Sequence, residues 1–98
     1  TRLARHGALY TADGRLQLKS ARHIRDHDPI EPGCGCYTCQ RFSRGYLRHL
    51  FHAGEMLGLR LASIHNLYFI VNLVRAIRAS ILDGTFLDFK ASFLARYR

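Results

Sequence analysis

Three cysteines within six residues are the side chains in this sequence best suited to hold a metal ion. Cys34, Cys36 and Cys39 are all the cysteines of the 98-residue chain, and an odd number argues against a disulfide framework. Three thiolates and one imidazole complete the tetrahedral shell of a structural zinc site and leave no position for a reactive water. The pattern therefore predicts one structural Zn²⁺. The alternatives are thiols without a ligand role, or one disulfide with a free thiol.

The fourth ligand has to come from six histidines. His65 is favoured because Ser63 could cap a helix that starts there, which would put His65 in the first turn of that helix. The cysteine run would lead into the preceding helix, where His49 and His52 remain the competing candidates. The other three, His6, His23 and His27, fall in polar or basic surroundings. Gly35 should let the backbone fold back between Cys34 and Cys36.

Two short segments ahead of the cysteines predict a β-hairpin. Residues 8–11 and 15–19 flank Ala12-Asp13-Gly14, and Asp-Gly between alternating residues is typical of a hairpin turn. Leu16 and Leu18 should lie on one face of the second strand, with Arg15, Gln17 and Lys19 on the other. Residues 20–33 are polar and contain both prolines, which favours a loop that delivers the cysteines.

Helical spacing dominates the rest of the chain. One helix is expected at residues 39–52 with Thr38 as its N-cap, and a second at residues 64–83, ended by Gly84. Between them, residues 53–58 should form a break. A third helix should start at Thr85 through a capping box in which Asp88 replaces the usual Glu. The predicted fold class is α+β and mostly helical. The apolar face of residues 64–83 is broader than this chain alone can cover, and the aromatic face Phe86, Phe89, Phe93 and Tyr97 is expected to be core or docking surface.

The charge of the chain favours a polyanionic partner. The formal net charge is +8 and the sequence pI is about 10.1, which points first to nucleic acid. The opening run Thr1-Arg2-Leu3-Ala4-Arg5-His6-Gly7 suits phosphate or base-edge contacts, although such a run can also be a solvated face. No uninterrupted apolar run approaches the ~20 residues of a membrane span, so no membrane partner is expected. Thiolate ligands imply a reducing, cytoplasmic compartment.

Several motifs together carry a resemblance to a known family. They are the opening Thr1–Gly7 run, Cys-x-Cys-Tyr-Thr-Cys at 34–39, Ser-Arg-x-Tyr-Leu-x-His-Leu at 43–50, Glu-Met-Leu-Gly at 55–58, and His-Asn-Leu at 65–67. In this order and spacing they resemble the C-terminal part of bacterial tRNA-guanine transglycosylase, the queuine tRNA-ribosyltransferase family. The resemblance covers the whole chain. It implies that the zinc ligands are Cys34, Cys36, Cys39 and His65.

The family's properties define what the resemblance implies about function. Its members are (β/α)₈ TIM-barrel enzymes that exchange guanine at the tRNA wobble position for 7-aminomethyl-7-deazaguanine, using an aspartate nucleophile. Neither family aspartate has a counterpart here, so no catalytic residue is assigned. No catalytic role is assigned to the other aspartates, Asp13, Asp26, Asp28, Asp83 and Asp88. This chain alone is expected to be inactive. The tRNA-contact run carries over onto Thr1, Arg2, Leu3, Ala4 and Arg5.

The resemblance also implies a division of the chain and a partner. Residues 1–33 would hold the tRNA-contact run, hairpin and loop, residues 34–65 the zinc subdomain, and residues 66–98 the C-terminal helices that pack on the barrel. The family forms a homodimer, for which Phe42, Tyr46 and His49 offer a candidate stripe at i, i+4 and i+7. A role of this stripe in the core remains open. The alternative to an enzyme segment is a free-standing zinc module that binds nucleic acid through its charge.

Overall fold

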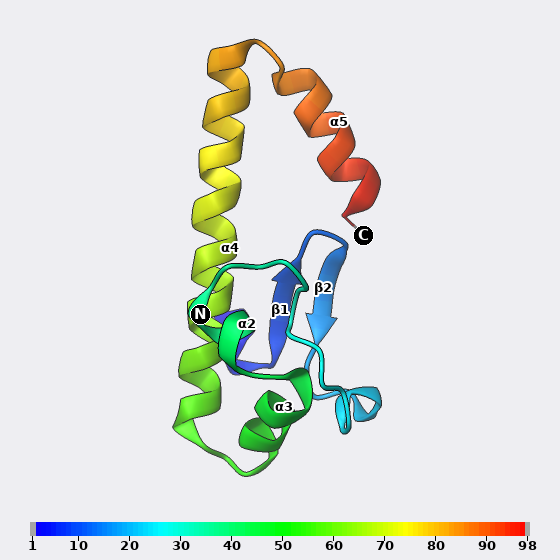
Figure 1. The fold of residues 1–98 in the computed structure, drawn as a ribbon, viewed down its shortest axis with the longest axis vertical. Helices are drawn as coiled ribbons and strands as arrows, with labels where there is room; N and C mark the ends of the chain where they lie inside the picture. Colours follow the sequence, from blue (N-terminus) through cyan, green and yellow to red (C-terminus); the bar gives the residue numbers. More distant parts are fainter. Residues whose placement is uncertain (1, 98) are drawn as a thin grey trace.

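Helix α4 (Met56–Asp83) runs the length of the molecule (Figure 1). The structure is a computed structural model that describes residues 2–97, and it measures 47 × 23 × 21 Å. The N-terminal half of α4 packs against α1, β1, α2 and α3, whereas α5 (Phe86–Arg96) turns back beside its C-terminal half (Figure 1). The fold is thus mostly helical with one small sheet, as the sequence predicts.

The predicted hairpin is present and lies against α4. It follows a four-residue helix, α1 (Arg2–Arg5), and consists of β1 (Ala8–Thr11) and β2 (Gly14–Gln17). The strands pair antiparallel, with Thr11 opposite Gly14 and Ala8 opposite Gln17. Gly14 has a φ of +124°, which explains why glycine follows the two-residue turn. The predicted faces are confirmed, because Leu18 is buried and Leu16 half-buried while Arg15, Gln17 and Lys19 are exposed.

The polar segment after the hairpin is a loop fastened to the helix that follows the cysteines. It contains one 3-10 turn, η1 (Ala21–His23). Arg44 donates from Nη1 to Asp26 Oδ2 (3.1 Å) and from Nη2 to the Ile30 carbonyl (2.9 Å). The backbone N–H groups of Arg44 and Gly45 donate to the carbonyls of Asp28 and Asp26. These bonds hold the loop in the course that leads to Cys34.

The predicted single helix at 39–52 is wrong, because the chain forms two helices there. α2 (Tyr37–Arg41) is followed by Phe42, whose backbone is extended, and α3 (Arg44–His52) begins after Ser43. Thr38 does not cap a helix. The Cys36 sulfur accepts the capping bond from the Cys39 N–H, and the Ser43 side chain caps α3 by accepting from the Tyr46 N–H. The Thr38 hydroxyl instead donates to the Leu61 carbonyl (2.7 Å), which ties α2 to α4.

The long helix begins earlier than the sequence suggests. α4 starts at Met56, so Ser63 lies inside it and does not cap it. The break is confined to the residues before Met56, and Gly58 belongs to the helix. A Cβ at Gly58 would lie 3.0 Å from Leu50 Cβ, so this glycine serves close packing of α4 on α3. The predicted end at Asp83 is confirmed, with Gly84 left-handed at φ +76°.

Helix α5 forms where expected but without the predicted capping box. The Thr85 side chain makes no capping bond at the N-terminus of α5, and its hydroxyl lies 3.5 Å from the Ser80 carbonyl. Along the helix, the rings of Phe89, Phe93 and Tyr97 stack in series. The Arg96 Nε donates to Asp13 Oδ1 (2.6 Å), which links the end of α5 to the hairpin turn.

The core lies at the N-terminal end of α4, and most apolar side chains near its C-terminal end are exposed. The buried apolar residues are Ala4, Leu9, Leu18, Ile30, Cys36, Cys39, Leu47, Leu50, Leu61 and Ala62. By contrast, Leu67, Val74, Ile81 and Leu82 of α4 are all more than half exposed, as are Leu87 and Leu94 of α5. We call these six residues the distal apolar face.

α4 is also long and apolar enough to cross a membrane by length and composition, with a mean hydropathy of 1.3. A search of the sequence for uninterrupted apolar runs misses this property.

Candidate metal centre

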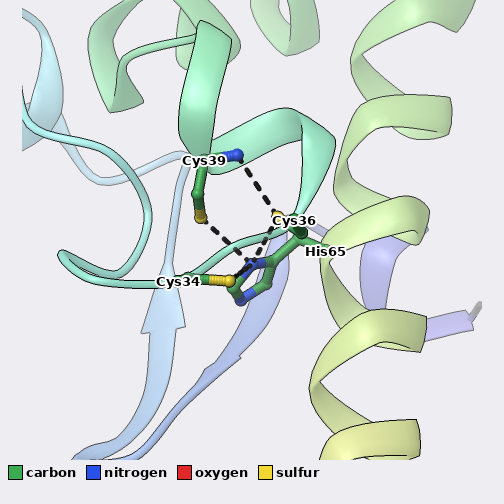
Figure 2. Close-up of side chains that lie close together, drawn as sticks. All are labelled: Cys34, Cys36, Cys39 and His65. Atoms are coloured by element: carbon green, nitrogen blue, oxygen red, sulfur yellow. Dashed lines mark hydrogen bonds between the residues drawn. The ribbon is translucent and has the colours of Figure 1, made fainter.

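Cys34, Cys36, Cys39 and His65 meet at one point between the cysteine loop and α4 (Figure 2). Their ligand atoms all lie within 4.8 Å of one another. Cys36 and Cys39 are buried, Cys34 is half-buried, and His65 has no exposed surface. Four residues separated by up to 31 positions therefore form one compact donor set that is closed to bulk solvent on most sides.

The distances match a tetrahedral zinc site. The Nδ1 atom of His65 lies 3.3 Å from the Cys39 sulfur, 3.5 Å from that of Cys36 and 3.8 Å from that of Cys34. Zinc bonds of about 2.3 Å to sulfur and 2.0–2.1 Å to nitrogen, at the tetrahedral angle, place those atoms about 3.5 Å apart. The donor set is thus a Cys₃His zinc site with no position left for a reacting group.

The His65 ring is oriented by a hydrogen bond on its far side. Its Nε2 donates to the Tyr10 carbonyl of β1 (2.6 Å), so the Nδ1 lone pair faces the three sulfurs. Neighbouring Asn66 holds the same strand with both ends of its amide, accepting from the Tyr10 N–H (3.0 Å) and donating to the Ala8 carbonyl (3.1 Å). The hairpin therefore belongs to the metal centre, which the spacing of the ligands alone could not reveal.

The cysteine loop is shaped by contacts with the hairpin and with α4. Glu31 accepts from the Ala12 N–H at the hairpin turn (2.7 Å), and its carbonyl accepts from the Cys34 N–H (3.0 Å). Gly35 does not have a left-handed backbone, and a Cβ there would lie 2.7 Å from the Tyr68 hydroxyl, so the end of that side chain would have to move. The Cys39 N–H donates to the Cys36 sulfur at 3.2 Å, a bond that also stabilises a thiolate.

Burial sets the protonation chemistry of the ligands in the absence of an ion. Burial raises the pKa of the Cys34 and Cys39 thiols, although backbone hydrogen bonds with Cys36 and Glu31, respectively, act in the opposite direction. Burial also lowers the pKa of His65, against the opposing effect of the Tyr10 carbonyl. A neutral imidazole is ready to bind metal, whereas the thiols must lose protons to the solvent as zinc enters.

The remaining histidines lie away from this centre. His49 and His52, the competing candidates, are exposed on α3, as are His6 and His27 elsewhere. His23 is buried and pairs through Nδ1 with Asp26 Oδ2 (3.2 Å). Burial raises the pKa of Asp26, but hydrogen bonds from the Asp28 N–H, His23 and Arg44 outweigh it and leave this pKa lowered. His23 thus helps to fix the loop.

Of the predicted RNA-contact residues, the structure describes the side chains of Ala4 and Arg5. Ala4 is buried against the core and Arg5 is exposed at the end of α1, while Thr1 and the side chains of Arg2 and Leu3 lie outside the described part. The aromatic stripe is partly open to solvent: Tyr46 is 43% exposed and stacks on Phe42 at 5.5 Å. Phe42 lies just before α3 and not on it, because that helix starts two residues later.

Comparison with known proteins places this zinc-binding segment in a family. The profile of queuine tRNA-ribosyltransferase matches residues 1–98. Relatives with that name include proteins from Symbiobacterium thermophilum (52% identical over 97 residues), Desulforudis audaxviator (53% over 95) and Streptococcus pyogenes (50% over 97). The matches cover 97–99% of this chain but only 24–26% of each relative.

The fold and the site define a Cys₃His zinc subdomain that carries a basic N-terminal run and two long helices. The chain belongs to the queuine tRNA-ribosyltransferase family. It spans about a quarter of the length of the relatives it matches, and corresponds to their C-terminal part.

Proposed function

We propose that this chain is the C-terminal part of a cytoplasmic tRNA-guanine transglycosylase, which exchanges guanine at the wobble position of tRNA for 7-aminomethyl-7-deazaguanine. The observation that carries the proposal is the match to the family over the whole chain together with an intact Cys₃His site. The rest of the enzyme would supply the barrel, the base pocket and the aspartate nucleophile. Thr1, Arg2, Leu3, Ala4 and Arg5 would contact the RNA.

Zinc would act on structure and not on the substrate. When bound, the ion joins the cysteine loop to α4 through four ligands, and α4 in turn packs against α1 and β1. The buried Ala4 anchors α1 on that platform while Arg5 remains exposed. The metal would thus help to fix the position of the RNA-contact run without touching it, because the ion holds α4 and α4 packs against α1.

The distal apolar face supports the presence of a large missing neighbour. Leu82 and Leu87 are more than three-quarters exposed on either side of the turn between α4 and α5. Large exposed apolar patches mark interaction sites. We assign it to the barrel formed by the other three quarters of the enzyme, so that residues 66–98 dock there. This exposed surface disfavours a free-standing zinc module. Contact with the barrel would also explain why α4 is apolar enough to cross a membrane although we propose no membrane partner.

The aromatic stripe is a candidate surface for a homodimer. Phe42 and Tyr46 are stacked, Tyr46 and His49 are exposed, and the stripe stands on helices fastened to the zinc loop. Rigid aromatic side chains are favoured at the centres of interfaces. Tyr46→Ala in the complete enzyme should raise the dimer dissociation constant. A purely structural role would instead lower thermal stability and leave that constant unchanged.

Base exchange in the complete enzyme tests the proposed function. Cognate tRNA and radiolabelled guanine should yield labelled RNA with the wild-type enzyme. Arg2→Ala and Arg5→Ala should each reduce exchange while zinc content stays at one equivalent, because the contact run and the metal ligands are separate sets of residues. A complete enzyme that holds zinc but incorporates no label would overturn the proposal.

A further inference from the structure

A cleft of about 450 Å³ opens onto one ligand of the zinc centre. Its walls come from the cysteine loop, from α4 and from α5, and they include Cys34, Gly35, Tyr68, Asn72, Phe93 and Arg96. The other three zinc ligands do not line this cleft. Cys34 therefore separates the metal position from a space that small molecules can enter.

Burial also distinguishes Cys34 from the other three ligands. Cys36 is 1% exposed, Cys39 8% and His65 not at all, whereas Cys34 is half-buried. Cys34 lies on the loop before α2, while Cys36 caps that helix and Cys39 lies inside it (Figure 2). Exposed thiolates react with oxidants and electrophiles, whereas buried structural cysteines are inert. Among the three sulfurs, that of Cys34 is the one open to such reagents.

The cleft admits small reagents and excludes large ones. A water molecule occupies about 30 Å³ in the liquid, and hydrogen peroxide is only slightly larger, so the cleft has ample room for it. Part of the wall formed by α5 is held in place at Arg96, whose Nε donates to Asp13 Oδ1 of the hairpin turn (2.6 Å). A folded protein could not reach the Cys34 sulfur through a space of this size.

We propose that Cys34 is an oxidation site, at which peroxide entering through this cleft opens the zinc centre and releases the ion. Cys36 and Cys39 react only after Cys34 has been modified. The inference concerns the zinc centre alone and does not depend on the proposed exchange of guanine.

The oxidation consumes one peroxide and two thiolates. The Cys34 thiolate attacks one oxygen of hydrogen peroxide, the O–O bond breaks, and the leaving hydroxide takes a proton from solvent to form water. This step leaves a sulfenic acid on Cys34. The thiolate of Cys36 or Cys39 then attacks the Cys34 sulfur, the S–O bond breaks, and the second hydroxide also leaves as water after protonation.

The result is a disulfide that includes Cys34. Two thiolates have lost two electrons in total, and peroxide has been reduced to two water molecules. The approach of the sulfurs is short, because all the ligand atoms of the centre lie within 4.8 Å of one another. Zinc retains one thiolate and His65, and two ligands are too few to hold it in a structural site.

The first test identifies the cysteine that reacts first in the complete, zinc-loaded enzyme. A limiting amount of N-ethylmaleimide is added, and the labelled peptides are mapped by mass spectrometry. Among the three ligands, Cys34 should carry the first adduct. With hydrogen peroxide in place of maleimide, a disulfide that includes Cys34 should form at the rate at which a chromophoric chelator detects released zinc. A thiol reductant and added zinc should restore the site.

A second test replaces single ligands by aspartate. A carboxylate binds zinc at a similar bond length to a thiolate and is not oxidised by peroxide. Cys34→Asp should slow the release of zinc by at least about 10-fold, because only buried thiolates remain. Cys39→Asp is the matched control. It retains Cys34 at the cleft and should release zinc at a rate within about 3-fold of the wild type.

A third test changes the cleft and leaves the ligands intact. Phe93 and Phe89 are half-buried rings in one stack on α5, but only Phe93 lines the cleft. Phe93→Ala should speed the release of zinc by peroxide, because it widens the path to Cys34. Phe89→Ala should leave the rate unchanged.

Two results would overturn the inference. They are a first adduct on Cys36 or Cys39, and release of zinc from Cys34→Asp as fast as from the wild type. If either aspartate variant fails to bind zinc, the order of labelling in the wild type still decides the question. An enzyme that loses zinc through Cys34 as described but exchanges no guanine would contradict only the proposed function.

Discussion

At the scale of single residues, the direction of one imidazole decides which histidine binds the metal. His65 presents Nδ1 to three sulfurs because its Nε2 is held by the Tyr10 carbonyl. His65→Ala should therefore lower zinc affinity by more than ~100-fold, since it removes a direct ligand. His52→Ala, on exposed α3, should leave affinity unchanged. Competition with a chromophoric chelator measures both, and equal losses in the two variants would contradict the assignment.

Asn66 shows how a neighbouring side chain supports the same centre. Its amide is the only side-chain partner found in the described part for the Tyr10 N–H and the Ala8 carbonyl. Asn66→Ala should lower the free energy of unfolding by about 1–3 kcal/mol, because two partly buried backbone groups would lose their partner. Thermal unfolding of the zinc-loaded protein measures the change.

Asn72→Ala provides the matched control for that measurement. Asn72 also lies on α4 and donates from its amide, but its bond to the Tyr68 carbonyl is exposed. Its removal should cost less than about 1 kcal/mol, because water can replace the lost partner. Similar losses in the two variants would show that the hairpin does not depend on Asn66.

At the scale of elements, local signals in the sequence predicted some boundaries and missed others. The hairpin turn, Gly84 and the loop to the cysteines were correct because turn and stop residues act over a few positions. The predicted start of the long helix and the predicted single helix over residues 39–52 were wrong, because these boundaries depend on packing between distant elements. Thr38 looks like a cap in sequence, but its hydroxyl bonds to the Leu61 carbonyl 23 residues away. The cysteines were evident from spacing, whereas the part of the hairpin in orienting His65 had no local signal.

The packing of α3 on α4 gives a prediction at this scale. Gly58→Ala would place a Cβ 3.0 Å from Leu50 Cβ and 3.4 Å from the Phe51 nitrogen, and neither atom is the free end of a flexible side chain. The helices must separate slightly, so the variant should be less stable by about 1–2 kcal/mol. This loss is the net change expected after the gain of up to ~1 kcal/mol that alanine brings over glycine in a helix interior.

Ala79→Gly measures the propensity effect without the contact. Ala79 lies in the same helix and is exposed, so glycine there should cost about 1 kcal/mol. Urea unfolding of both variants gives the comparison. Stabilisation by Gly58→Ala would show that the interface between α3 and α4 has room for a methyl group.

At the scale of the whole molecule, the two ends of α4 have different surroundings. The N-terminal half carries His65 and Asn66 and packs on the hairpin, α1, α2 and α3. The C-terminal half contacts α5 and presents most of the distal apolar face. The zinc centre therefore lies at one end of the molecule, and the other end carries the exposed apolar residues that we assign to contact with the rest of the enzyme. This division agrees with a chain that spans a quarter of its relatives.

The last prediction separates RNA binding from base exchange in the isolated chain. With a net charge of +8, the zinc-loaded chain should bind tRNA weakly, and its affinity should fall as salt rises because each neutralised phosphate releases counterions. Incubation with cognate tRNA and radiolabelled guanine should leave no label in the RNA, because the aspartate nucleophile and base pocket would come from the rest of the enzyme. Gel-shift titrations and scintillation counting measure the two properties. Label above a blank without protein would show that these 98 residues contain a catalytic centre of their own.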